Sequence, residues 1–417
     1  MSTLPVATPL SAWRDPATWA RVADIVVVLI AVSLPWSTTL VSIFAVSWVI
    51  ILVPTLRIEP FLHSLRRPEC ILPIALFLLA VAGTLWATDI PWGARLRGIN
   101  PVAKLLAIPF LIFHFERSSR GIWVFAGFLF SCTVLMLVSW TSVIVPTLTP
   151  KSALQPGVPV KNYIDQSQAF ALCAVALAWP VLELLRARRV VLALSSVVIS
   201  LAFIANMMFA VVARTALIYV PVMLLIFGFL HLSRRDFALT VLAGVAITAL
   251  VWFASPNLQS RTQSIFVEYA KYKTSDELTS VGMRLEFWRK SLIFFREAPF
   301  VGHGSGSTET LFERSAMGQT GLAAQIVRNP HNQTLNVAVQ WGLMGCAVLY
   351  AMWFVHFMMF RGIGIAAWVG LLAVVQNVIS SLFNSHLFDF VPGWIYVLSV
   401  GVAGGMLFQG KQSAART

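Results

Sequence analysis

The sequence predicts an all-α, polytopic integral membrane protein with about 12 transmembrane helices, and three observations support this fold class. Of the 417 residues, 58% are hydrophobic and only 11% are charged, whereas a soluble domain is about 25% charged. The mean hydropathy is +0.80. Apolar residues also gather into runs close to the roughly 20 residues that a helix needs to cross the hydrocarbon core.

Scanning for such runs gives about twelve candidates. They lie at residues 22–36, 38–56, 70–87, 101–115, 121–146, 167–185, 190–211, 215–232, 237–254, 332–360, 363–385 and 390–409. The first, fourth and sixth runs are short or carry a charge, namely Asp24, Lys104 and Glu183, so the number is stated as about twelve. Mixed charges precede the first run and no small-residue cleavage pattern follows it, so we expect no cleaved signal peptide.

Basic residues mark every second turn between the predicted spans. They are Arg57, Arg66 and Arg67, then Arg117 and Arg120, then Arg186, Arg188 and Arg189, then Arg234 and Arg235, and then Arg361. Because short cytoplasmic loops are enriched in lysine and arginine, we expect these turns and both termini to be cytoplasmic. The segment 255–330, between the ninth and tenth runs, is then external.

The formal charge of +13 is larger than these turns require. With Arg14, Arg21, Lys411 and Arg416 at the termini, the cytoplasmic sites account for 15 of the 30 Lys and Arg residues, and the other fifteen fall in external loops or spans. They are neither clustered on a soluble domain nor interleaved with stacking aromatics, so nucleic acid is not an expected partner. An anionic, lipid-linked ligand outside the membrane fits better, together with the membrane lipids themselves.

Neither a metal centre nor a disulfide framework is expected. The four cysteines fall far apart in predicted spans, at Cys70, Cys132, Cys173 and Cys346. The chain contains no H-E-x-x-H, D-x-D or G-x-S-x-G motif, so metal-dependent and serine-nucleophile chemistry have no support. No cofactor is expected.

The external segment is expected to fold, because it is long and shows apolar periodicity. Its centre, "SVGMRLEFWRKSLIFFREAPFVGHGSGS", predicts a helix over about 282–297 that ends at a proline and a glycine-rich turn. Helical spacing puts Arg284 in one stripe with Trp288, Ser291 and Phe295. This stripe predicts that Arg284 faces inward.

The other charged residues of this helix are expected to face outward. Glu286 and Lys290 are predicted to pair at i, i+4 on a solvated side. Arg289, Lys290 and Arg296 are predicted to contact headgroups or solvent. The following turn, "GHGSGS", could offer backbone amides to an anion, but a plain chain reversal is the favoured interpretation.

A second isolated arginine lies in the apolar stretch 190–232. As a single helix this stretch would extend about 65 Å, twice the roughly 30 Å core, so the chain must turn near its middle. Arg214, in "AVVARTALIYVP", lies at that turn on the external side. It could snorkel to the interface, or it could face a cavity and bind an anion, which is the default expectation for an ionisable residue at membrane depth.

His331 lies at the external end of the tenth predicted span, in "RNPHNQTLNVAVQWGLMG". Asn329 is a good N-cap and Pro330 suits a first turn, so His331 is predicted to lie within that turn. The amides and dipole at a helix N-terminus disfavour a further positive charge, which would keep the imidazole neutral and able to accept a proton. A histidine that only caps or snorkels is the alternative.

Three segments together resemble the O-antigen ligase and polymerase superfamily of bacterial envelope glycosyltransferases. They are "ARTALI" after a long apolar run, "GMRLEFWRKSLIFFREAPFVGHGSGS", and "PHNQTLNVAVQWGLMG", in which Gly-Leu-Met-Gly follows the His-Asn pair. The resemblance covers residues from about 190 to 400, and over about the first 150 residues it rests on topology alone.

The resemblance implies a GT-C-like enzyme of the Gram-negative inner membrane with its active site on the periplasmic side. Residues 1–254 and 331–417 would form the transmembrane part, and 255–330 a folded periplasmic loop. In lipopolysaccharide biosynthesis such an enzyme transfers O-antigen glycan from undecaprenyl pyrophosphate to the lipid A-core oligosaccharide, by a metal-independent, inverting mechanism.

The residues essential to the family map onto Arg214, Arg284 and His331. Two guanidiniums can stabilise the charge that develops on a pyrophosphate leaving group without a metal ion. Further substrate contacts are expected from Lys161, Arg261, Arg289, His303, Arg328 and Asn332.

Two alternatives remain open. A sister enzyme, the O-antigen polymerase, has similar spans and arginines but joins lipid-linked repeat units to one another. The compact "RLEFW" helix, the glycine-rich turn and the His-Asn pair fit a ligase better. A lipid or ion transporter is less favoured, because such proteins usually show internal repeats and broken helices at membrane depth, and neither is visible in this sequence.

Overall fold

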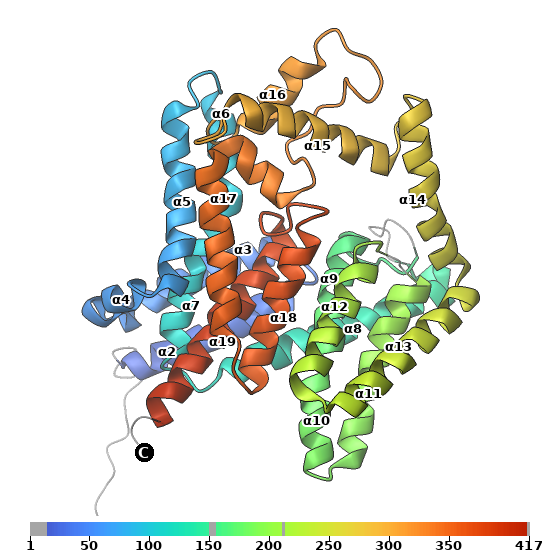
Figure 1. Cartoon of the computed structure of the whole chain (residues 1–417). Helices are drawn as coiled ribbons and strands as arrows, with labels where there is room; N and C mark the ends of the chain where they lie inside the picture. The colour runs from blue at the N-terminus through green and yellow to red at the C-terminus, as the bar shows by residue number, and fades with distance from the viewer. Residues whose placement is uncertain (1–14, 150–155, 211–212, 415–417) are drawn as a thin grey trace, which may run out of the picture.

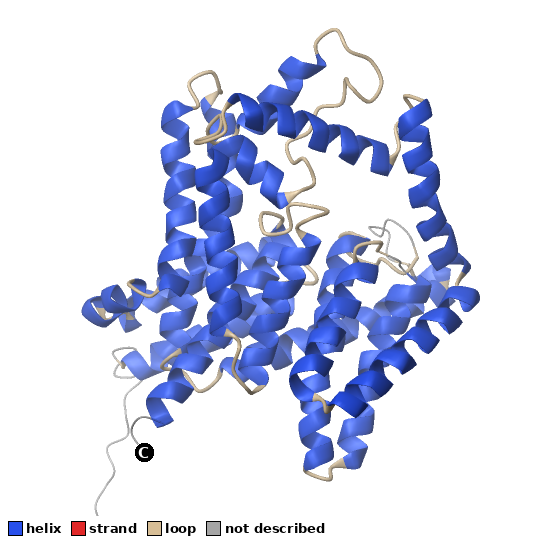
Figure 2. Ribbon diagram, viewed as in Figure 1, coloured by secondary structure: helices blue, strands red, loops and turns tan. Residues whose placement is uncertain are grey.

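The computed structural model of the chain describes residues 15–149, 156–210 and 213–414. The described part is helical throughout and contains no β-strand (Figure 2). Ten of its helical stretches are long and apolar enough to cross a membrane, and two shorter apolar helices accompany them. The predicted all-α, polytopic membrane fold is therefore confirmed.

Each of the twelve predicted spans corresponds to one helix or to two helices in series. The first six are α2 (Pro16–Ser33), α3 (Thr38–Leu52), α5 (Pro68–Trp86), α6 (Trp92–Ala103) with α7 (Ala107–Phe115), α8 (Gly121–Ile144), and α9 (Tyr163–Ala176) with α10 (Ala178–Arg186). The last six are α11 (Val190–Ala205), α12 (Ala216–His231), α13 (Arg234–Ala254), α17 (Gln333–Met359), α18 (Ile365–Ser380) and α19 (Phe390–Ala414). A short helix, α4 (Ile58–Leu65), precedes α5.

Charged residues inside the predicted spans have polar partners. Asp24 of α2 is buried and accepts hydrogen bonds from His114, at 2.8 Å, and from Arg120, at 3.2 Å. Lys104, in the turn between α6 and α7, donates to two backbone carbonyls just before α19. Such pairing is what allows ionisable groups to occur within otherwise apolar runs.

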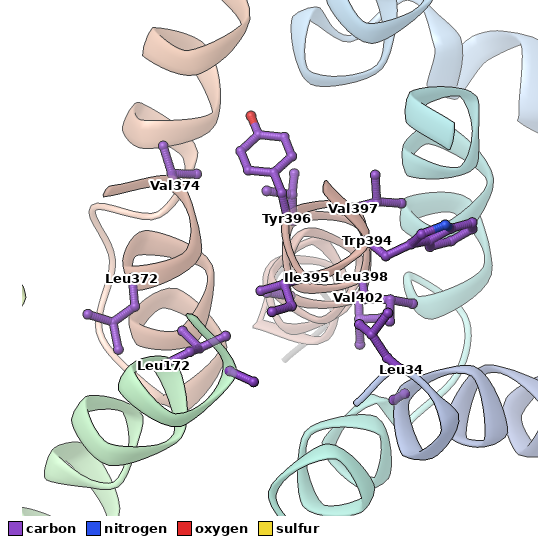
Figure 3. Packing of buried hydrophobic residues seen from close by; sticks show 14 of the residues in the cluster. Leu34, Leu172, Leu372, Val374, Trp394, Ile395, Tyr396, Val397, Leu398 and Val402 are labelled. Atoms are coloured by element: carbon purple, nitrogen blue, oxygen red, sulfur yellow. The ribbon is translucent and has the colours of Figure 1, made fainter. Parts of the chain in front are cut away.

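Helix α19 is the most buried of the candidate spans in the described part of the chain. It is apolar on nearly every side, as expected of a helix that is buried all round. Figure 3 shows Trp394, Ile395 and Tyr396 pointing away from this helix in different directions. Peripheral helices instead expose large apolar side chains, such as Val191 (77% exposed) and Leu250 (70%), as lipid-facing helices do.

Three helices lie between α13 and α17 in the chain, namely α14 (Pro256–Thr274), α15 (Ser280–Glu297) and α16 (Ser307–Ala316). In Figure 1, α15 runs across the top of the molecule from α14 towards α17. The turn between α10 and α11 and the C-terminal end of α19 point to the opposite side. The segment predicted to be external and turns predicted to be cytoplasmic thus lie at opposite ends of the bundle.

The glycine-rich turn after α15 packs against a kink in α17. Gly342 interrupts α17 with a φ of 59°. Nearby, the amides of His303 and Gly304 donate to the carbonyls of Val339 and Gln340, at 2.9 and 2.8 Å. The next two amides of the turn are also bonded within the protein. Because these amides are engaged, they do not form an anion site, and the predicted chain reversal is confirmed.

Candidate functional site

His331 lies one residue before the N-cap of α17. It has a φ of 56°, a left-handed conformation that is uncommon outside glycine, and its N–H donates to Asn329 Oδ1 at 2.9 Å. The helix is capped by Asn332, whose Oδ1 accepts from the N–H of Leu335. The prediction that Asn329 caps the helix and that His331 lies in its first turn is therefore wrong. Asn329 instead binds His331 and Ser385 through its side-chain oxygen.

Asn384 determines which nitrogen of His331 carries the proton. Its Nδ2 donates to Asp389 Oδ2 at 2.8 Å, so its Oδ1 faces Nδ1 of His331, also at 2.8 Å. An amide oxygen can only accept a hydrogen bond, so the histidine must be protonated on Nδ1. Nε2 then keeps its lone pair and can take up a proton.

The imidazole of His331 is neutral near pH 7. Burial lowers its pKa below the ordinary 6.5, the hydrogen bond to Asn384 opposes this shift, and the positive charge of Arg284 adds to it. Phe287 of α15 stacks on the ring, with 6.2 Å between the centroids. The neutral state agrees with the prediction, but its main cause is burial rather than the helix terminus.

Arg284 connects the histidine to the second arginine. It lies in the predicted inward stripe of α15, in which Ser291 is fully buried. Burial lowers the pKa of its guanidinium; Tyr163 and Glu268 oppose this shift, and the charge of Arg214 adds to it. Within the described part of the chain its side chain makes no hydrogen bond or ion pair. Its guanidinium is therefore available to a ligand.

Arg214 lies in the turn before α12, as predicted, and α14 orients it. Its Nη2 donates to Ser264 Oγ and to Glu268 Oε1, both at 2.6 Å. Burial raises the pKa of the Glu268 carboxyl, but hydrogen bonds from Arg214 and from the backbone of Val281 outweigh this and hold the pKa below its ordinary value. The guanidinium is thus held against protein and is not simply extended to the membrane interface.

The three residues predicted to be catalytic therefore come together from distant parts of the chain. Arg284 is close enough to act electrostatically on both Arg214 and His331. Glu268 balances only part of the charge of the two guanidiniums. A pair of guanidiniums beside a neutral base suits an anionic group next to a hydroxyl that loses its proton. The described residues contain no group of three or more His, Cys, Asp or Glu side chains that could hold a metal ion.

Three other residues that were predicted to contact the substrate form hydrogen bonds or ion pairs with other parts of the protein. Arg328 pairs with a glutamate of α16 at 2.7 Å, on an exposed surface. His303 donates from Nε2 to the carbonyl of Phe294, at 2.8 Å, near the far end of α15 from Arg284. Lys161 donates to the carbonyl that follows α2, and burial lowers its pKa to about 8.

Two further residues that were predicted to contact the substrate lie on helices that form the site. Asn332 borders His331 as the N-cap of α17, and its Nδ2 donates to the carbonyl of Leu382 at 3.0 Å. Arg261 lies on α14, but its side chain is outside the described part of the structure.

The pairing predicted for Glu286 and Lys290 is wrong. Glu286 pairs instead with Arg289, at 2.6 Å, and the arginine is half exposed. Lys290 is only 4% exposed, and its ammonium donates to Ser315 Oγ at 3.0 Å and to the carbonyl of Ala323. It anchors the chain after α16 and does not contact headgroups or solvent, because that chain folds back over its face of α15.

Sequence reasoning missed Asn384, Asp389 and Glu268. The first two lie in "SLFNSHLFDF", a short polar loop between two apolar spans on the same side as His331, and this pattern could have indicated them. Burial raises the pKa of the Asp389 carboxyl to about 7. Nothing in the sequence indicated that Glu268 belongs to the site, because acidic residues of an amphipathic helix usually face water.

The fold and the site define a multi-pass membrane protein with two arginines and a neutral histidine near one another at one end of its helix bundle. Residues 199–350 match the Wzy_C family model, described as O-antigen ligase. This segment of the chain is therefore similar to the O-antigen ligase family, which confirms the predicted resemblance. A match to a family of ligases supports, at a general level, that the chain is an enzyme.

The chain is also similar to a protein of Haemophilus influenzae that is described as uncharacterized. The two are 29% identical over 143 residues, which is 33% of this chain and 36% of that protein. The chain therefore spans about a third of the length of this relative, and the similarity is confined to one segment of each protein.

Proposed function

We propose that the chain transfers O-antigen glycan from undecaprenyl pyrophosphate to the lipid A-core oligosaccharide, at the periplasmic face of the Gram-negative inner membrane. The observation that carries this proposal is that α15 links the three residues. Arg284 lies on α15 between Val281, whose N–H donates to the Glu268 that pairs with Arg214, and Phe287, which stacks on His331. Residues 1–254 and 331–417 form the membrane part of the enzyme, and 255–330 form the periplasmic loop that completes its site.

The two arginines bind the pyrophosphate of the donor. When the bond between the glycan C1 and the phosphate oxygen breaks, negative charge develops on that oxygen. A guanidinium binds two phosphate oxygens at once through its planar fork, which an ammonium cannot do. Among the described residues the Arg284 guanidinium has no hydrogen-bonding partner, whereas Arg214 is oriented by Glu268. The charge is therefore stabilised by the chain itself, without a metal ion or cofactor.

His331 is the general base of the transfer. Its Nε2 takes the proton from the acceptor hydroxyl, and the hydroxyl oxygen attacks C1 from the side opposite to the phosphate. The electron pair of the C1–O bond leaves with undecaprenyl pyrophosphate. A single displacement of this kind inverts the configuration at C1. A positioned base contributes about 10² to 10⁴ in rate.

An O-antigen polymerase is the second candidate, because the matched family includes both activities. A polymerase would use the same two arginines and histidine with a second lipid-linked repeat unit as its acceptor. The two functions therefore differ in the acceptor and share the chemistry of the site.

The test is a deletion of the gene, complemented with the wild-type chain or with His331→Ala. We expect the deletion strain and the His331→Ala strain to lack lipopolysaccharide-attached O-antigen while lipid-linked polymer accumulates. Attachment of single repeat units would indicate a polymerase instead. Unchanged lipopolysaccharide in the deletion strain would contradict both functions.

A further inference from the structure

A polar groove with a volume of about 630 Å³ runs along one face of α14 and reaches the first turn of α15. Gln259 and Gln263, and likewise Ser264 and Glu268, line it as pairs four residues apart, so each pair lies along the same side of the helix. Ser280, at the start of α15, lines the opposite wall. The groove extends from residue 256 to 271 of α14, about 22 Å at 1.5 Å per residue.

The lining is chemically suited to neutral polar ligands. The charged side chains described there have partners: Lys271 pairs with Glu277 at 2.8 Å, and Glu268 pairs with Arg214. The side chains of Ser260 and Gln263 make no hydrogen bond within the described part of the chain. Amides and hydroxyls that both donate and accept match the hydroxyl groups of sugars. A lipid tail would need an apolar lining.

The groove begins at the site described above. Ser264 and Glu268 line the groove, and the same two side chains hold Arg214 at 2.6 Å. His331 lies at the other end of the cluster, beyond Arg284. A ligand in the groove therefore lies beside the two side chains that orient Arg214.

We propose that this groove on α14 and α15 binds the sugar residues of the lipid-linked donor that follow the first sugar on its pyrophosphate. The proposal rests on the proposed transfer reaction. The donor is favoured over the acceptor because the donor glycan is bonded directly to the phosphate that Arg214 holds, whereas the acceptor hydroxyl must meet His331. The groove then contributes selection for the identity and length of the transferred glycan.

The test fills the groove and leaves the arginines and the histidine unchanged. Gln263 is exposed, so Gln263→Trp adds bulk within the groove without disturbing a core. The matched control is Gln319→Trp, at an exposed glutamine between α16 and α17, outside the groove. Transfer by the purified full-length chain is measured with a donor that carries the complete O-glycan and with a donor that carries one sugar on undecaprenyl pyrophosphate.

We expect Gln263→Trp to raise KM for the complete donor by about tenfold, as loss of one or two hydrogen bonds would. Its kcat, its KM for the lipid A-core acceptor and its use of the one-sugar donor should stay close to those of the wild type. Gln319→Trp should behave as the wild type throughout. A rise in KM for the acceptor, an equal loss with both donors, or no change would each overturn the proposal.

A binding measurement separates this proposal from the proposed function. The probe is the O-glycan released from lipid and pyrophosphate, titrated against the full-length chain by saturation-transfer NMR. Binding to the wild type and to Gln319→Trp, with loss in Gln263→Trp, supports the groove even if the chain transfers no glycan. Active transfer with equal glycan binding by all three chains overturns the groove and leaves the transfer reaction intact.

Discussion

The amide oxygen of Asn384 lies 2.8 Å from Nδ1 of His331 and leaves Nε2 as the proton-accepting nitrogen. The amide cannot turn over without losing its other hydrogen bond, from Nδ2 to Asp389 Oδ2. The tautomer of His331 is thus set by a side chain 53 residues away in the sequence. If His331 is the base, Asn384 is a positioning residue for it.

Exchanging Asn384 should change the pH dependence of transfer. The neutral imidazole is the active form, so activity falls as the pH drops through the pKa of His331, which burial keeps below 6.5. In Asn384→Asp the new carboxylate favours the imidazolium, so the acidic limb of kcat/KM should move to higher pH. Asn384→Ala should lose about tenfold or more at every pH, as expected of a base whose tautomer is no longer fixed. An unshifted acidic limb in Asn384→Asp would argue against this role.

Lysine should not replace either arginine. We propose that Arg214 and Arg284 each bind the pyrophosphate through two parallel hydrogen bonds, which lysine cannot form. A hydrogen bond to a charged group contributes roughly 1.5 to 3 kcal/mol, so each Arg→Lys variant should lose about 2 kcal/mol or more of transition-state stabilisation. The measurement is kcat/KM with the lipid-linked donor. Near-normal transfer by both lysine variants would mean that a point charge is sufficient.

His331→Ala should fold and still bind the donor, because both arginines remain. Transfer should fall by about 10² to 10⁴, the usual contribution of a positioned base. His331→Gln should be nearly as inactive, since an amide cannot take up the proton. Donor binding is measured in parallel, and a loss of donor affinity in step with activity would assign His331 to the pyrophosphate instead.

Single cysteines introduced into a cysteine-free chain should report the orientation. Ser275, Ala187 and Arg234 are all exposed, so each substituted thiol is reachable on its own side of the membrane. Residue 275 should react with an impermeant maleimide in intact spheroplasts, and residues 187 and 234 only after permeabilisation. Labelling of residue 275 from the cytoplasm would contradict a periplasmic site.

Lys290 should matter for stability more than its neighbour Arg289. Lys290→Ala leaves its buried partners without their donor, so we expect a loss of roughly 1.5 to 3 kcal/mol in the free energy of unfolding. Arg289→Ala removes an ion pair whose arginine is half exposed, which is worth less than about 1 kcal/mol. Thermal unfolding in detergent compares the two, and equal stability of both variants would contradict the burial of Lys290.

Local patterns in the sequence determined the membrane fold. Hydropathy predicted the twelve spans, and helical spacing predicted α15 and the inward stripe of Arg284, because burial in lipid or against a bundle acts on each segment by itself. The stretch 190–232 is too long to cross the membrane core once, so it must turn near its middle. This requirement indicated Arg214 in the same way.

Tertiary packing decided how these residues meet. The contacts of Arg214 with Glu268 and of His331 with Asn384 join residues more than fifty positions apart, and no periodicity encodes such pairs. The N-cap of α17 moved to Asn332 because Asn329 is occupied by other partners. Likewise, i, i+4 spacing suggested a solvated Lys290, but the chain after α16 covers that face. Long-range contacts compete with local preference for each polar group, and the fold determines which of them forms.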